Sequence, residues 1–265
     1  MNADIAYANA DFIDGAQEFP ARWQAKAAAF RVELQAAGRA QIDLPYGPGA
    51  RQIFDFFQPK NTPRGLVMFF HGGYWVAFDK SSWSHLAAGA LAHGFAVAMP
   101  SYTLAPKARI SGITREAARA IEAAAALVSG PIALTGHSAG GHLVARMNCT
   151  DVALSPDVAA RLKRINPISP VADLRPLLQT KMNADFQMDM AEATAESPLL
   201  HDKRRGVKSH IWVGADERPV FLDQARWLAE GWPEADLNTT PYAHHFNVID
   251  DLADPESAMV KSLLP

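Results

Sequence analysis

The sequence predicts one α/β domain, in which a mostly parallel sheet is covered by helices on both faces. Strand-like and helix-like segments alternate along most of the 265 residues, as in sheets built from β-α-β units. The clearest strand segments are continuous apolar runs without alternation, which is typical of strands buried on both faces. The length fits a single domain better than two small ones, so we expect residues 1–265 to fold as one unit.

Each expected element rests on its own local pattern. Residues 21–38 are rich in helix formers and end at Gly38, which suits a helix C-terminus. The later helix over 113–130 has one apolar stripe, made of Ile113, Ala117, Ile121, Ala124 and Val128. The expected strands are 50–59, 65–70, 95–100, 131–136, 164–169, 209–215 and, more weakly, 235–242. The remaining expected helices are 81–94, one that starts at 139, 221–231 and 252–264.

Residues 170–205 interrupt this alternation, because they contain no strand pattern and mix prolines, methionines and polar residues. We expect them to form a small insertion above the C-terminal ends of the strands, where they would act as a lid or pocket wall. The alternative is a surface excursion without a role in function.

Composition excludes several classes of function. The formal charge of −3 does not favour a nucleic-acid partner, and no apolar run approaches the roughly 18 residues of a membrane span. The N-terminus lacks the pattern of a secretory signal. The single cysteine, Cys149, excludes an internal disulfide and is expected to be a packed core thiol. We therefore expect a cytoplasmic protein that acts on a small molecule, with a homodimer left open.

A candidate nucleophile follows the expected strand 131–136. Ser138 lies in the frame Gly-His-Ser-Ala-Gly, directly before a helix. Gly-x-Ser-x-Gly between a strand and a helix is the nucleophile elbow, in which small residues allow a sharp turn that presents the serine. The competing interpretation is a tight turn with an incidental serine. The stretch lacks the lysine of a phosphate-binding loop, and His137 and His142 are spaced wrongly for a zinc site on a helix.

A serine nucleophile also needs an oxyanion hole, a base and an acid. The stretch HGGYW, residues 71–75, follows the buried strand 65–70 and resembles the HGGG-type hole motif. The acid is expected after the strand 209–215, where Asp216 is the first candidate and Glu217 its closest rival. The histidine is expected after the last strand, where His244 and His245 are adjacent and spacing alone does not separate them.

Together these motifs resemble the α/β-hydrolases, and within them the group around kynurenine formamidase (arylformamidase), a neighbour of the hormone-sensitive-lipase-like esterases. The resemblance covers most of the chain and includes HGGYW, SYTLAP, GHSAGGHL, GADERPVFLDQA and HHFNVID. It implies Ser138 as nucleophile, Asp216 as acid and His245 as base. It further implies an oxyanion hole from the amides of Gly72, Gly73 and Ala139, with Trp75 and residues 170–205 facing the substrate.

The expected function is therefore a serine hydrolase, without a cofactor or metal, that cleaves a small amide or ester. The expected substrate is an aryl formamide such as N-formylkynurenine, and Tyr74 and Trp75 beside the hole would favour a flat leaving group. One alternative is a short-chain carboxylesterase or thioesterase. Another, from a different class, is a binding protein that has the hydrolase fold and does not use its triad.

Overall fold

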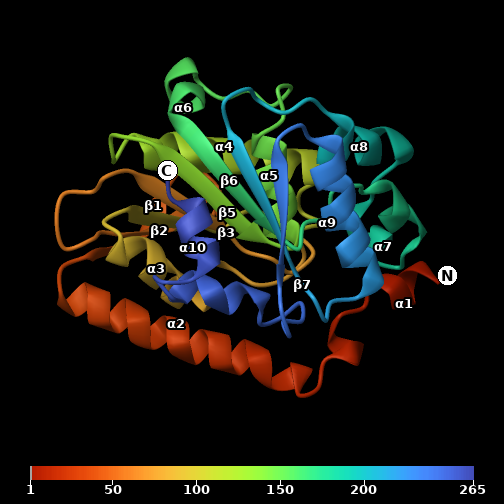
Figure 1. Ribbon diagram of the computed structural model, residues 1–265, viewed down its shortest axis with the longest axis horizontal. Coiled ribbons are helices and arrows are strands. Elements are labelled where there is room, and N and C mark those ends of the chain that lie inside the picture. The colour runs from red at the N-terminus through yellow and green to blue at the C-terminus, as the bar shows by residue number, and fades with distance from the viewer. Residues whose placement is uncertain (1) are drawn as a thin grey trace.

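The computed structural model describes residues 2–265 and shows an eight-stranded sheet with helices on both sides (Figure 1). The strand order is β1-β2-β4-β3-β5-β6-β7-β8. Strand β2 is antiparallel to both of its neighbours, and the other adjacent pairs are parallel. The strands are β1 (Ala40–Pro45), β2 (Ile53–Phe57), β3 (Leu66–Phe70), β4 (Ala96–Pro100), β5 (Ile132–His137), β6 (Leu162–Ile168), β7 (Lys208–Gly214) and β8 (Ala235–Thr240).

The helices are placed between and around these strands. The α-helices are α1 (Ala3–Tyr7), α2 (Phe19–Ala36), α3 (Ala88–Ala92), α4 (Ile110–Ala125), α5 (Ala139–Met147), α6 (Pro156–Arg161), α7 (Asn183–Phe186), α8 (Met190–Ala195), α9 (Pro219–Gly231) and α10 (Ala258–Leu263). Short 3-10 helices are η1 (Ala10–Phe12), η2 (Ala16–Glu18), η3 (Lys80–Ser82), η4 (Ser84–Ala87), η5 (Arg175–Gln179), η6 (Pro198–Leu200) and η7 (Val248–Ala253).

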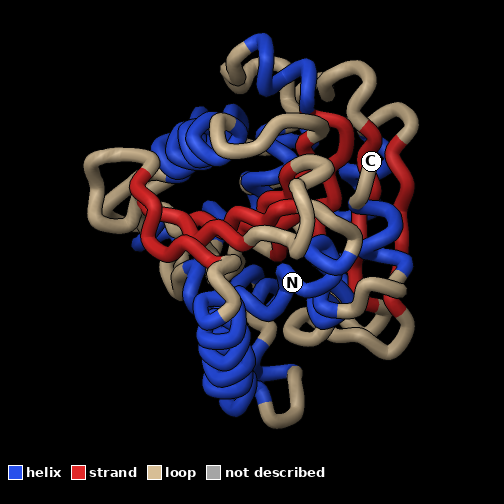
Figure 2. The backbone as a smooth tube through the Cα atoms, turned by 90° about the vertical axis from the view of Figure 1, so that its left-hand side faces the viewer, coloured by secondary structure: helices blue, strands red, loops and turns tan. Residues whose placement is uncertain are grey.

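Strand β3 shows how the sheet separates two hydrophobic cores. Successive side chains of a strand point to opposite faces. Leu66, Met68 and Phe70 therefore pack with α4, α5 and α9, whereas Val67 and Phe69 pack with α2, η4 and α10. Figure 2 shows the strands between helices on either side. Burial on both faces explains why this strand is apolar throughout, and the predicted α/β fold with a mostly parallel sheet is confirmed.

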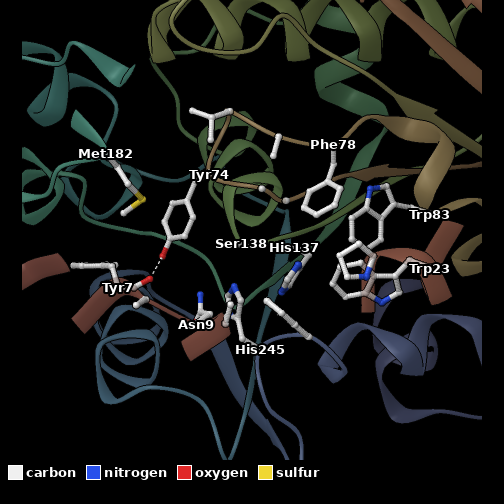
Figure 3. A pocket seen from close by; sticks show the side chains of 18 of the residues that line it. Tyr7, Asn9, Trp23, Tyr74, Phe78, Trp83, His137, Ser138, Met182 and His245 are labelled. Atoms are coloured by element: carbon white, nitrogen blue, oxygen red, sulfur yellow. Dashed lines mark hydrogen bonds between the residues drawn. The ribbon is translucent and has the colours of Figure 1, made fainter. Parts of the chain in front are cut away.

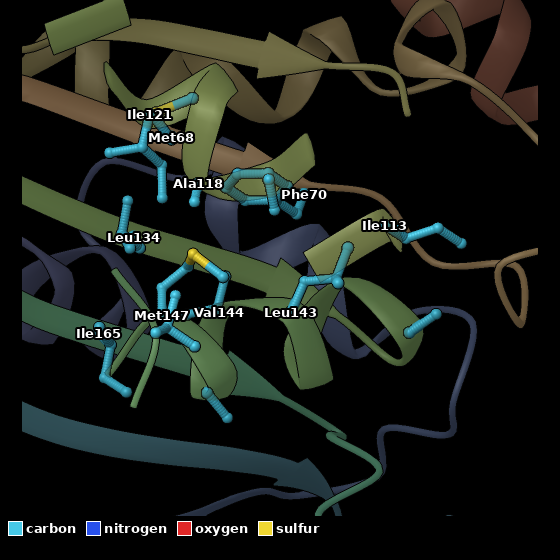
Figure 4. Packing of buried hydrophobic residues seen from close by; sticks show 14 of the residues in the cluster. Met68, Phe70, Ile113, Ala118, Ile121, Leu134, Leu143, Val144, Met147 and Ile165 are labelled. Atoms are coloured by element: carbon cyan, nitrogen blue, oxygen red, sulfur yellow. The ribbon is translucent and has the colours of Figure 1, made fainter. Parts of the chain in front are cut away.

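The apolar stripe expected from the sequence is confirmed, because all five of its members are buried; four of them lie on α4, and Val128 lies just beyond its end. Ile113, Ala118 and Ile121 of α4 face the same core as Leu143 and Met147 of α5 (Figure 4). Burying an isoleucine side chain stabilises a protein by roughly 1.5–3 kcal/mol, so this stripe accounts for much of the attachment of α4. The helix after Ser138 is thereby held firmly against the sheet.

Strand β1 differs from the expected elements, whereas residues 170–205 lack a sheet strand, as expected. Strand β1 was not expected, because it is an edge strand with alternating exposure whose pairing with β2 is interrupted near Asp43. Residues 170–205 form η5, α7, α8 and η6, and they do not contribute a strand to the sheet. Phe186 and Met188 of this segment are buried in the core, and Met190 is exposed.

Cys149 is fully buried, as expected, and its burial raises the pKa of the thiol to about 12. The thiol is therefore a poor nucleophile and behaves as a small apolar side chain. No helix within residues 2–265 is both long enough and apolar enough to cross a membrane.

Candidate active site

The candidate site lies at the carboxyl ends of five parallel strands. The segments that follow β3, β5, β6, β7 and β8 bring the glycine pair, Ser138, Ser169, Glu217 and His245 to the same edge of the sheet. Ligand sites of open parallel sheets form at this edge because the strands end together there. Figure 3 shows Ser138, His137 and His245 around a common cavity.

Ser138 occupies a sharp turn between β5 and α5. Its φ of 56° and ψ of −114° are strained for a residue with a side chain. Gly140 makes the turn possible, because a Cβ there would collide with the carbonyl oxygen of Phe70. The amide of Ser138 donates to the Ile168 carbonyl at 2.8 Å, and its side chain does not cap α5. The hydroxyl is thus held at the start of a helix without being used by that helix.

Three amides beside Ser138 are free to bind an oxyanion. Within residues 2–265, the N–H groups of Gly72, Gly73 and Ala139 have no hydrogen-bond acceptor. Gly73 has a φ of 104°, and a Cβ there would approach the Ala77 carbonyl oxygen to 2.6 Å. A Cβ on Gly72 would lie 3.3 Å from the Ser138 Cβ, which places the glycine pair directly against the turn. Ala139 begins α5, where the helix dipole favours negative charge.

The imidazole of His245 is bonded to Glu217 rather than to Asp216. His245 Nδ1 lies 2.6 Å from Glu217 Oε2, and both side chains are buried. Asp216 is exposed, and within residues 2–265 it is bonded through its backbone amide alone, which donates to the Ala243 carbonyl at 2.9 Å. The expectation that Asp216 is the acid beside the histidine is corrected by this geometry. Among residues 2–265 no hydrogen bond joins His245 to the Ser138 hydroxyl, a contact that often forms only with substrate present.

Glu217 is itself held by two donors. Its Oε1 accepts from the Ser169 hydroxyl at 2.5 Å and from the Gly214 amide at 2.8 Å. The Glu217 side chain is completely buried, so these bonds compensate for the desolvation of its charge. The carboxylate therefore presents its remaining oxygen to His245 in a fixed direction.

The other two histidines near Ser138 have different surroundings. His244 Nδ1 accepts from the Phe246 amide at 3.1 Å, and its own amide donates to Asn247, so it belongs to the turn. The His137 ring lies 4.6 Å from that of His245. Burial, together with the neighbouring His245, holds the pKa of His137 well below its usual value. His137 is therefore neutral near pH 7.

A cavity of about 460 Å³ opens above Ser138. Its walls are mainly aromatic and aliphatic, and His137, Ser138 and His245 lie at its base. The aromatic residues in its lining are Tyr7, Trp23, Tyr74, Phe78, Trp83 and Phe246. Asp4 is the one Asp, Glu, Lys or Arg that lines the cavity in the described part of the chain. Such a site suits a small, largely apolar molecule.

Of the two aromatic residues expected to face the substrate, Tyr74 and Trp75, only Tyr74 lines the cavity. Tyr74 lines the cavity, and its hydroxyl donates to the Tyr7 carbonyl at 2.7 Å. Trp75 is fully buried, and its ring packs edge-on against His142 and Phe186. The expectation for Trp75 is therefore corrected, because this side chain belongs to the core beneath the cavity.

The N-terminal segment, residues 2–13, forms one wall of the site, which the sequence did not indicate. Tyr7 is buried, and its hydroxyl accepts from Gln224 Nε2 at 2.9 Å. The Arg218 guanidinium lies over the ring of Phe12 at 3.5 Å from its centroid. Asp4, Tyr7, Ala8, Asn9 and Ala10 line the cavity. From residues 170–205, Met182 alone does so.

Glu217 was placed second to Asp216 from the sequence, and the N-terminal wall was not indicated, for different reasons. Asp216 and Glu217 are adjacent after one strand, and the direction of side chains in a tight turn cannot be deduced from residue types. Residues 2–13 are short and show no periodic pattern that would indicate a docked segment. No group of three His, Cys, Asp or Glu side chains within residues 2–265 is arranged to hold a metal ion.

Comparison with known proteins places this geometry among hydrolases. A kynurenine formamidase from Danio rerio is 28% identical over 237 residues, which are 84% of this chain and 80% of that protein. A kynurenine formamidase from Salmo salar is also 28% identical, over 87% of this chain and 83% of that protein.

Solved structures of similar fold include other hydrolases. A protein from Silicibacter sp. TM1040 that carries a provisional thioesterase assignment is 56% identical, with a TM-score of 0.96 and 99% coverage of both chains. An arylesterase structure has a TM-score of 0.70 at 18% identity over 86% of each chain, which supports the fold alone. Residues 67–240 match the family described as having the alpha/beta hydrolase fold, and this chain belongs to that family.

Proposed function

We propose that this protein is a cofactor-independent serine hydrolase that cleaves a small aryl formamide. Ser138 is the nucleophile, His245 the general base and Glu217 the acid that orients it. The amides of Gly72, Gly73 and Ala139 form the oxyanion hole. The observation that carries the proposal is the aromatic cavity that has Ser138 and His245 at its base and Glu217 bonded behind the imidazole.

The reaction follows from these positions. Ser138 Oγ attacks the formyl carbon while His245 Nε2 takes its proton, and the free amides stabilise the negative oxygen. His245 then returns the proton to the leaving nitrogen, so the C–N bond breaks and a formyl ester remains on Ser138. Water attacks that ester while His245 takes its proton, and His245 then gives the proton to Ser138 Oγ as the acyl C–O bond breaks, which releases formate and restores the serine. Glu217 keeps Nδ1 protonated and stabilises the imidazolium ion during both steps.

The shape and polarity of the cavity favour an arene as the leaving group. Tyr74, Phe78 and Trp83 offer faces and edges against which a flat ring can stack. A formyl group is the smallest acyl group, and it needs little room beside the glycine pair. Relatives named kynurenine formamidase support the same reaction class.

A short-chain ester or thioester is the second candidate. The same serine, histidine and oxyanion hole would cleave either, and the 56% identical protein carries a provisional thioesterase assignment. The two candidates differ in the acyl group and in the leaving atom. The two candidate functions can therefore be distinguished by comparing substrates that differ in the acyl group.

The test is kcat/KM for a fixed aryl leaving group as the acyl group lengthens from formyl through acetyl to butyryl. We expect kcat/KM to fall along this series. A rise toward butyryl would mean that an acyl pocket exists and would favour the esterase candidate.

Ser138→Ala should reduce kcat by on the order of a millionfold. Turnover of Ser138→Ala within tenfold of the parent would exclude Ser138 as the nucleophile. A parent protein that neither turns over these substrates nor reacts with a fluorophosphonate at Ser138 would instead favour a binding role.

A further inference from the structure

The His245 ring is held by a single hydrogen bond. Its Nδ1 donates to Glu217 Oε2 at 2.6 Å, and within residues 2–265 no other hydrogen bond involves the ring. One bond fixes the position of Nδ1, but the ring can still tilt about that atom. The reaction requires Nε2, on the far side of the ring, to face the Ser138 hydroxyl. The direction of Nε2 therefore depends on what packs against the ring.

Two neighbouring rings pack against His245, and they come from different elements. The centroid of the Phe221 ring, near the start of α9, lies 4.3 Å from that of His245, at an interplanar angle of 41°. The His137 ring, at the end of β5, lies 4.6 Å away at 46°. Phe221 is fully buried in the core, whereas His137 lines the catalytic cavity. His137 is thus the neighbour on the cavity side, where Ser138 lies.

The His137 side chain also packs against the proposed oxyanion hole. A Cβ on Gly72 would lie 3.1 Å from His137 Nδ1, so the imidazole fills the space beside that glycine. His137 is the last residue of β5, and Ser138 follows it directly. Figure 3 shows the His137 and His245 rings next to each other at the base of the cavity. One side chain therefore contacts the general base and the hole from the same turn that carries the nucleophile.

The His137 ring is uncharged, which suits a neighbour of the general base. Burial, and after it the neighbouring His245, holds the pKa of His137 well below its usual value. His245 becomes a cation when it takes the proton of Ser138, and a second positive charge on a ring 4.6 Å away would oppose that step. A neutral imidazole packs against the base without this repulsion.

We propose that His137 is a positioning residue, whose ring holds the His245 imidazole so that Nε2 faces Ser138. This inference rests on the proposed serine mechanism, in which His137 acts through His245. Reacting side chains must be held close to their productive geometry by neighbours that are themselves fixed by packing, and a displacement of about 1 Å can lower a rate about a hundredfold. His137 is 5% exposed and packs against both Gly72 and His245, so its own ring is fixed.

The experiment measures kcat and KM of the parent and of His137→Ala on 4-nitroformanilide and on 4-nitrophenyl acetate, together with the rate of inactivation by a fluorophosphonate. We expect His137→Ala to lower kcat about ten- to a hundredfold on both substrates and to leave KM within about threefold, because the base is displaced. The inactivation rate should fall with kcat, since Ser138 is activated by the same base. His137→Phe keeps a flat, uncharged ring and should recover most of the loss.

A double variant tests whether His137 acts through the general base. Glu217→Gln already disables His245, so adding His137→Ala to it should lower kcat by less than about threefold further. A further loss as large as that seen in the parent background would mean that His137 acts on another part of the site, and it would overturn the inference.

His85→Ala is the matched control, because His85 is also a buried, uncharged histidine but does not line the cavity. It should keep the kcat of the parent, and thermal melting checks that each variant is folded. His137→Asn also removes the ring, and it gives the same test where His137→Ala does not fold. An unchanged kcat with a raised KM would make His137 a substrate contact, which overturns the inference and leaves the proposed function intact. A parent that neither cleaves these substrates nor reacts with the fluorophosphonate would instead overturn the proposed function.

Discussion

The choice between two adjacent acids can be tested by single substitutions. Glu217 is buried and bonded to His245 Nδ1, while Asp216 is exposed. We expect Glu217→Gln to keep the fold and to lower kcat by about four orders of magnitude, because the imidazole tautomer is no longer fixed. Asp216→Asn should stay within about twofold of the parent. Steady-state kinetics on both proteins check this, and an active Glu217→Gln beside an inactive Asp216→Asn would reverse the assignment.

At this scale the sequence predicts the backbone of the site better than its side chains. The turn at Ser138 and the glycine pair follow from residue types, because only small residues allow those conformations. The role of Glu217 as the acid does not follow from residue types. Its side chain is held in place by the hydroxyl of Ser169, which is 48 residues away in the sequence. Trp75 was misplaced for a similar reason, since its direction is set by packing against Phe186.

Individual elements differ in how closely their sequence determines them. The central strands were predicted because burial on both faces makes them apolar throughout, whereas β1 at the edge has alternating exposure and no such signature. Residues 2–13 were not recognised as part of the site. Their attachment depends on single long-range contacts, such as that of Tyr7 with Gln224, which leave no periodic pattern.

The contribution of residues 170–205 to the stability of the fold can be tested at two positions, one in α7 and one in α8. Phe186 is fully buried against Trp75, whereas Met190 is 59% exposed. We expect Phe186→Ala to reduce the free energy of unfolding by about 3–5 kcal/mol, because it removes a ring from a packed core. Met190→Ala should change it by less than about 0.5 kcal/mol. Urea denaturation of both variants decides the matter, and equal small effects would mean that α7 is a loosely attached cover.

The whole molecule has several histidines that are buried in the neutral form. Burial lowers the pKa of His71 and of His85 to about 4, and that of His142 to about 3. None of these three rings lines the catalytic cavity. His71 adjoins the proposed oxyanion hole, because its Nδ1 lies 2.8 Å from the Gly72 carbonyl oxygen. His85 does not belong to that loop, so its titration separates the pH dependence of stability from that of catalysis.

The sign of this effect follows from linkage. An unfolded histidine binds a proton below about pH 6.5, whereas the folded form does so only near pH 4 or lower. Between these values the unfolded state binds more protons, so stability falls as the pH falls through that window. Burial raises the pKa of Asp250 and of Asp251 in the folded protein. These two carboxyl groups therefore favour the folded state as the pH falls through the lower part of the same window, which opposes the effect of the histidines.

We therefore expect the free energy of unfolding to be lower at pH 5 than at pH 7, by about 2 kcal/mol for each buried histidine before the aspartates are counted. Urea denaturation at the two pH values measures the difference. His85 is the best position for a matched variant, because both ring nitrogens lack a partner within residues 2–265. His85→Leu should reduce the loss between pH 7 and pH 5 by about 2 kcal/mol, since a leucine cannot take up the proton in either state. A variant with the same loss as the parent would show that His85 gains its proton in the folded protein, and the acid sensitivity would then have to come from His71 and His142.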